Sequence, residues 1–158
     1  MKRFALAAPL LALLLISACG TGGPPRRVSE PSANVQQLSV RANGSWSLDL
    51  RIDNFSSVPM RFDTIDLAMT IKGQAPVALK ASPGFTIGPE SADVATIQVA
   101  PPSGAKIAIT DALVRGRAID YHLEGTITAT PENGKPRTFP FKRDNALAPV
   151  PGLPGVLR

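Results

Sequence analysis

The segment from Trp46 to Asp53 alternates strictly between apolar and polar side chains, and this alternation limits the folds open to the chain more than any other feature. Successive side chains of a β-strand point to opposite faces, so the segment is typical of a strand with one buried face. A second long run, Ile119 to Ala129, alternates in the same way, and shorter runs lie at residues 35–41, 77–79, 93–99 and 137–142. The pattern predicts a mainly all-β protein built from antiparallel strands.

Turn signals separate these runs. Asn43-Gly44 and Asn133-Gly134 each lie between two alternating runs, and Asn-Gly is a strong signal for a tight hairpin. Pro140 stands within the last run and has no N–H to donate to a neighbouring strand, which predicts that this strand lies at the edge of a sheet.

The segment from Met60 to Lys72 changes phase. Met60 and Phe62 are apolar at even positions, whereas the apolar residues from Ile65 to Ile71 occupy odd positions. A single strand can bury both sets only if an extra residue shifts the pleat, which predicts a bulge near Asp63-Thr64. The alternative is two strands separated by a bend.

Residues 103–117 depart from the alternation and predict one short helix. Ser103 stands where it would cap the helix, and Gly116 stands where it would end it. About seven short strands with regular turns predict an antiparallel β-sandwich. The expected core consists of Trp46, Leu48, Leu50, Ile52, Phe62, Leu67, Ile97, Leu123 and Ile127.

The amino terminus has the layout of a secretory signal peptide over residues 1–18: a basic start, 13 apolar residues from Phe4 to Ile16, then small residues. An apolar run of this length is too short for a membrane-spanning helix, which needs about 20 residues. Ile16-Ser17-Ala18-Cys19 resembles the lipobox of bacterial lipoproteins. That resemblance implies cleavage before Cys19 and attachment of acyl chains, palmitate among them, to Cys19. Gly20 in the next position favours the outer membrane, facing the periplasm.

The mature chain would then have three parts. Residues 19–33 are rich in Gly and Pro and predict a flexible tether behind the lipidated Cys19. Residues 34–147 contain the predicted sandwich. Residues 148–158 form a Pro-rich apolar tail, which either lies along a sheet edge or remains an extended arm for a partner.

The segment Leu48–Gln74, "LDLRIDNFSSVPMRFDTIDLAMTIKGQ", resembles the late embryogenesis abundant (LEA) type 2 family, whose core is the water-stress and hypersensitive-response (WHy) domain. Asn54, Pro59 and Gly73 hold family motif positions, although Phe55 stands where the family often has Pro. Tyr121 and Gly125, in "IDYHLEGTITAT", resemble the family's Tyr-x-hydrophobic-x-Gly strand. The similarity spans about residues 34–147.

This resemblance implies a sandwich related to fibronectin type III folds, with a helical segment between strands. It implies no catalytic residue, and it links the chain to desiccation and stress protection. For Asn54 we expect a structural role, because an Asn at a strand end tolerates positive φ and hydrogen-bonds the turn backbone.

The residue inventory excludes much enzyme chemistry. The chain has one Cys and one His, so it cannot form a disulfide framework or a site with several Cys or His metal ligands. Loss of residues 1–18 would leave 15 basic and 12 acidic residues without a basic run, which argues against nucleic-acid binding. Arg115 and Arg117 are solvated charges or contacts for anionic lipid.

His122, the single His, is predicted to lie exposed on the polar face of its strand. The acidic residues predicted to alternate with basic ones on a hydrated surface are Asp49, Asp53, Asp63, Asp66 and Glu124. We therefore predict no catalytic residue, cofactor, metal or small-molecule substrate.

Two functions are consistent with these sequence features. The first is a non-enzymatic, lipid-anchored envelope protein that protects unfolding client proteins or membranes during desiccation or other stress. The alternative is a periplasmic interaction module of an envelope assembly or a lipid-trafficking system.

Overall fold

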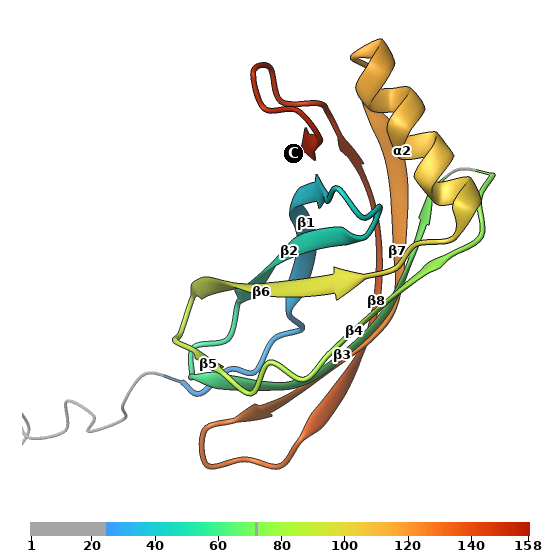
Figure 1. Cartoon of the computed structure of the whole chain (residues 1–158). Coiled ribbons are helices and arrows are strands. Elements are labelled where there is room, and N and C mark those ends of the chain that lie inside the picture. The colour runs from blue at the N-terminus through green and yellow to red at the C-terminus, as the bar shows by residue number, and fades with distance from the viewer. Residues whose placement is uncertain (1–24, 72) are drawn as a thin grey trace, which may run out of the picture.

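The computed structural model describes residues 25–71 and 73–158, so the predicted signal segment and Cys19 lie outside the described residues. Two antiparallel sheets pack face to face (Figure 1). The first contains, in spatial order, β6 (Ser91–Val99), β2 (Trp46–Asn54), β1 (Ser32–Val40) and β9 (Val156–Leu157). The second contains β4 (Val77–Ala81), β3 (Met60–Ile71), β7 (Ile119–Pro131) and β8 (Arg137–Leu147), and β5 (Thr86–Ile87) also pairs with β3. The predicted antiparallel β-sandwich with one short helix is confirmed.

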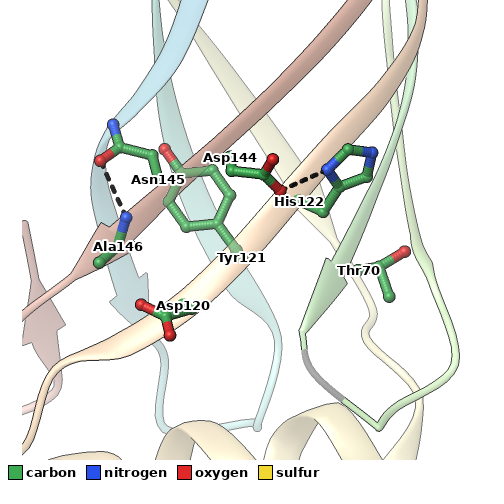
Figure 2. A pocket seen from close by; sticks show the side chains of 7 residues that line it. All are labelled: Thr70, Asp120, Tyr121, His122, Asp144, Asn145 and Ala146. Carbon is green, nitrogen blue, oxygen red and sulfur yellow. Dashed lines mark hydrogen bonds and ion pairs between the residues drawn. The ribbon is translucent and has the colours of Figure 1, made fainter.

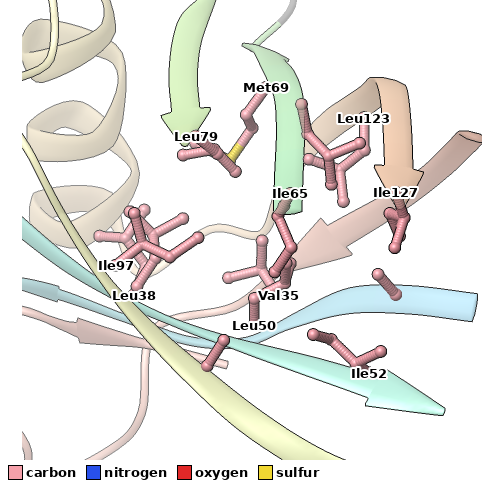
Figure 3. Close-up of a cluster of buried hydrophobic side chains, with 14 of the residues drawn as sticks. Val35, Leu38, Leu50, Ile52, Ile65, Met69, Leu79, Ile97, Leu123 and Ile127 are labelled. Atoms are coloured by element: carbon pink, nitrogen blue, oxygen red, sulfur yellow. The ribbon is translucent and has the colours of Figure 1, made fainter. Parts of the chain in front are cut away.

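The apolar faces of the two sheets form one core. In Figure 3, Leu38 and Leu50 of the first sheet face Ile65, Met69 and Leu123 of the second. All nine residues of the predicted core are buried. Alternation therefore identified the inward face correctly, because the pleat sends every second side chain between the sheets.

β3 is one continuous strand with a bulge, as predicted. Its pairing with β7 shifts register between Phe62 and Thr64. The shift brings both Phe62 and Ile65 into the core, although they differ in sequence parity. The two-strand alternative is therefore wrong.

Both predicted hairpins and the predicted edge strand are present. The β1–β2 hairpin turns through Gly44, which has a φ of 77°. The β7–β8 hairpin turns at Asn133, whose φ is 56°. Pro140 lies in β8, and β8 ends the spatial order of its sheet.

The helix α2 (Ser103–Arg115) links the two sheets, because it follows β6 and precedes β7. Gly116 ends it with a φ of 61°, as predicted. The predicted Ser103 cap is wrong: Pro102 occupies the cap position without a side-chain hydrogen bond, and Ser103 is the first helical residue. Among the described residues no helix has the length and hydropathy that a membrane span needs.

The tail lies against the sheet edge rather than extending as a free arm. After β8 the chain turns back, and Ala148 and Arg158 exchange backbone hydrogen bonds of 2.6 and 2.9 Å. β9 then pairs with β1 in the other sheet, and Leu157 is fully buried. The tail thereby connects the edges of the two sheets.

The ordered chain begins before residue 34. β1 starts at Ser32 and buries Ala33, so the last two residues of the expected tether belong to the sheet. We call the end of the sandwich formed by residues 25–31 and the β2–β3 and β7–β8 loops the base. The opposite end, which carries α2 and the tail, is the apex (Figure 1).

Candidate functional site

A hollow of about 570 Å³ lies beside β3, β7 and β8, and it contains the single His of the chain (Figure 2). Antiparallel register places Thr70, His122 and Asp144 next to one another across the three strands. The lining residues are Thr70, Asp120, Tyr121, His122, Asp144, Asn145 and Ala146.

The His122 ring lies between two carboxylates. Its Nδ1 lies 2.6 Å from Asp144 Oδ1, and its Nε2 lies 3.6 Å from Glu124 Oε2. A general base for a nucleophilic hydroxyl must present a free ring nitrogen to that hydroxyl. Here Nδ1 is within hydrogen-bond distance of Asp144, whereas Glu124 lies beyond that distance from Nε2. Among the described residues His122 makes no hydrogen bond to a hydroxyl, so the structure shows no pair of base and nucleophile here. His122 is half-buried, more enclosed than the sequence suggested, because the carboxylates of adjacent residues and strands flank it.

Tyr121 lies on the opposite face of β7 and joins the two sheets. The Val35 backbone N–H in β1 donates a hydrogen bond of 3.1 Å to the Tyr121 hydroxyl, and the Tyr121 side chain is buried. Burial raises the pKa of Tyr121 above 10.0, although the Val35 and Asn145 hydrogen bonds and the Arg143 charge oppose that rise. Asn145 lies beside the phenol in Figure 2.

Asn54 is a buried polar side chain at the base. Its Nδ2 donates to the carbonyl oxygens of Val58, Ile87 and Gly88 at 3.0, 3.1 and 2.8 Å. Its Oδ1 accepts the Ser56 N–H at 2.9 Å. The side chain therefore hydrogen-bonds the turn, as an Asn at a strand end was expected to do. It does so from β2 without a positive φ, because the strand conformation already points the amide into the loop.

The other motif positions also shape the backbone. Gly125 has a φ of 150°, and a Cβ there would lie 2.2 Å from the Asp66 carbonyl oxygen, so only glycine fits against β3. Gly73 follows β3 with a φ of 77°. The Pro59 carbonyl oxygen accepts the Glu132 N–H at 2.9 Å and ties the two loops of the base together.

The five acidic residues singled out in the sequence are dispersed and engaged locally. Their partners are Thr96 for Asp49, Arg51 for Asp53, Arg61 and Thr130 for Asp63, Lys80 for Asp66, and His122 and Lys142 for Glu124. The described residues contain no group of three or more His, Cys, Asp or Glu that could hold a metal ion. These pairs form a surface of mixed charge, as the sequence predicted.

Arg115 and Arg117 at the apex both bind Asp111, at 2.5 and 2.9 Å. The Arg115 hydrogen bond, with help from Arg117, holds the pKa of Asp111 below its ordinary value. The sequence indicated these cations as solvated charges or lipid contacts. The structure adds their shared carboxylate partner, which lies four residues before Arg115 on the same helix face.

Comparison with known proteins gives a family. A family model described as late embryogenesis abundant protein, LEA_2, matches residues 49–145. No curated protein matches the sequence. Similar solved structures include the putative ApaA protein from Bordetella pertussis, with 15% identity, a TM-score of 0.49, and coverage of 82% of this chain and 100% of that chain.

Two further similar structures were solved in solution. AT1g01470 from Arabidopsis thaliana has 16% identity and a TM-score of 0.49, with coverage of 79% of this chain and 81% of that chain. A putative late embryogenesis abundant (LEA) protein, At2g46140.1, has 12% identity and a TM-score of 0.48, with coverage of 94% of this chain and 80% of that chain.

Replacing Asn54 should destabilise the base. Asn54→Ala leaves the Ser56 N–H and several buried carbonyl groups without a partner, and we expect the free energy of unfolding to fall by at least about 2 kcal/mol. Asn43→Ala is the matched control, because the exposed Asn43 also bonds its turn, at 3.0 Å to the Ser45 N–H. Urea unfolding of both variants measures the difference. Equal urea midpoints for Asn54→Ala and Asn43→Ala would show that the buried amide stabilises the fold no more than the exposed one does.

Tyr121→Phe should change how stability depends on pH. Because the folded pKa of Tyr121 is raised, the unfolded chain loses the phenolic proton first, and wild-type stability falls as the pH rises above about 10. Tyr121→Phe lacks this group and should be less stable by about 1–3 kcal/mol near pH 8 because the Val35 N–H loses its acceptor. The gap between the two proteins should narrow near pH 11. Tyr121 is the single Tyr, so a gap that stays constant would contradict the assignment.

Proposed function

This chain belongs to the LEA_2 family of late embryogenesis abundant proteins, and from that premise we propose that it is a non-enzymatic, lipid-anchored envelope protein that protects proteins or membranes during desiccation or other stress. The observation that carries the proposal is the family match over residues 49–145, which covers most of the sandwich. We also propose that this sandwich is a WHy domain.

The lipid anchor is supported by the sequence Ile16-Ser17-Ala18-Cys19. Several acyl chains on one residue bind a bilayer far more stably than a single chain does. Lipidation would also remove the lone thiol, which would otherwise be exposed to an oxidising compartment. Gly20 supports the outer membrane, with the domain in the periplasm.

The proposed mechanism is weak contact over a stable surface. Many charged side chains on the outer faces are paired locally. Among the described residues, the large exposed apolar side chains are Phe55 at the base and Ile107, Val114 and Leu153 at the apex. Such a surface stays hydrated and can still touch unfolding clients through these apolar groups.

One observation favours the alternative, a periplasmic interaction module. At the apex, Leu113 and Val114 of α2 and Val150 and Leu153 of the tail line a mostly apolar hollow of about 410 Å³. Val114 is 81% exposed. In this alternative, one specific partner protein buries these side chains, and the protein does not act on many different clients.

Cys19→Ser should abolish the lipid anchor. The hydroxyl of Ser is a much weaker nucleophile than a thiol, so we expect neither fatty-acid label nor membrane retention in the variant. Metabolic labelling with a fatty-acid probe, followed by membrane fractionation, measures both. Equal label on the wild type and on Cys19→Ser would remove the lipoprotein part of the proposal.

Protection should survive the single substitution of polar side chains on the outer faces. The mature chain with Cys19→Ser should preserve the activity of a drying-sensitive enzyme better than an inert protein of equal mass. His122→Ala, Asp53→Ala and Glu124→Ala should each retain that effect, because weak contacts are spread over the surface whereas catalysis concentrates energy in a few groups. Protection equal to that of the inert protein would leave the interaction module as the leading function. Loss of protection in one folded variant would reveal a discrete site.

A further inference from the structure

We propose that the base of the sandwich faces the membrane that holds the lipid anchor, with the Phe55 side chain in contact with the lipid headgroups. The inference rests on the proposed acylation of Cys19 and adds to it an orientation. It follows from three features of the base: a segment bound to the loop after β2, the short length of chain before that segment, and an exposed aromatic side chain beside it.

The first feature is that residues just after the expected lipid site are bound to the domain. The Arg27 N–H donates to Ser57 Oγ at 2.8 Å, and the Ser57 N–H donates to the Arg27 carbonyl oxygen at 3.0 Å. Ser57 Oγ also donates to the Pro25 carbonyl oxygen at 2.9 Å. Two residues after Arg27, the Ser29 N–H donates to the buried Ser56 Oγ at 3.0 Å.

A second contact fixes the same segment to the neighbouring loop. Arg26 Nη2 donates to the Glu132 carbonyl oxygen at 2.5 Å, and Glu132 belongs to the β7–β8 loop. The segment that enters the domain therefore bonds two loops of the base, and Pro25, the first described residue, already takes part in this attachment.

The second feature is the length of chain between this attachment and the lipid. Six residue steps separate Cys19 from Pro25, and a fully extended chain spans at most about 20 Å over that number. A tether that continued to residue 33 would reach about 50 Å on the same measure. The bonds to Ser56 and Ser57 thus keep the base within about 20 Å of the anchor.

The apex lies farther away than this. β7 begins next to the end of α2 and ends at the base with Pro131, and its 13 residues span about 40 Å. Figure 1 shows α2 and the entering chain at opposite ends of the molecule. An upright domain therefore presents its base to the bilayer and its apex to the periplasm.

The third feature is the chemistry of the base. Phe55 is 52% exposed on the β2–β3 loop, and its carbonyl oxygen accepts a 3.0 Å hydrogen bond from Arg27 Nη2. Aromatic side chains are favoured at the membrane interface. Arg27 forms an ion pair with Glu90 at 3.6 Å, and Arg26 donates to the backbone carbonyl oxygen of Glu132 rather than to its carboxylate. The base thus carries cations beside its acidic residues, and these cations are compatible with lipid phosphates.

Tryptophan reporters at the two ends test the orientation. The mature chain, from Cys19 onward, is coupled through its single Cys to maleimide-bearing phosphatidylethanolamine in vesicles of phosphatidylethanolamine and phosphatidylglycerol. Phe55→Trp reports the base and Val114→Trp reports the apex, and the buried Trp46 adds the same background to both. We expect a nitroxide-headgroup lipid to quench Phe55→Trp several-fold more strongly. Equal quenching, or stronger quenching of Val114→Trp, would overturn the proposal.

A linker variant tests whether the short chain sets the orientation. A Gly-Ser insertion of about 15 residues between Gly23 and Pro24 extends the maximal reach by about 50 Å. The difference in quenching between the two reporters should shrink. An unchanged difference would show that the attached segment does not set the orientation.

Chemical coupling separates this proposal from the lipoprotein proposal. If Cys19 carries no lipid in cells, the labelling experiment fails, but the coupled protein still reports which end faces the bilayer. If labelling succeeds and the reporters are quenched equally, the orientation alone is wrong.

Discussion

The Asn54 amide and the hydroxyls that follow it hold the base of this sandwich together. The amide hydrogen-bonds the loop after β2 and the chain after β5, and its Oδ1 positions Ser56. Ser56 in turn accepts a hydrogen bond from Ser29 of the entering segment. A buried amide is costly unless all its groups are paired, and here both ends are paired, so the loop has one favourable arrangement. The attachment of residues 25–29, and with it the inferred membrane orientation, depends on that arrangement.

Away from the base, a hydrogen bond to Tyr121 and the pairing of β9 with β1 join the two sheets. Tyr121 reaches across the core to the Val35 N–H, while the tail leaves one sheet and adds β9 to the other. Hydrophobic burial between the sheets is non-directional, so it favours compaction without fixing how the edges align. The directed bonds of Asn54, Tyr121 and the tail set that alignment.

The surface of the sandwich differs between its faces and its two ends. Many charges of the outer faces are paired locally, and His122, which lines the hollow, lies 2.6 Å from Asp144. The apolar side chains that remain exposed lie mainly at the two ends: Phe55 at the base, and Val114 and Leu153 at the apex. Under the proposed lipid anchoring, the base would face lipid and the apex would meet clients or a partner.

The sequence by itself determined seven of the nine strands, the β3 bulge, both hairpins, the Gly116 helix end and the core, because each depends on local periodicity or on the conformational range of one residue. It did not predict β5 and β9, which have two residues each and so carry no periodicity. The sequence did not determine which side chain pairs with which carboxylate. Asp144 joins His122 only because β8 pairs with β7 in one register, 22 residues apart. The same holds for Tyr121 with Val35, for the docking of the tail, and for residues 25–29, which resemble a linker in composition yet bind the loop at Ser57. These contacts join segments distant in sequence, and composition carries no information about which distant partner a backbone N–H or hydroxyl will meet. Tertiary structure alone decided them.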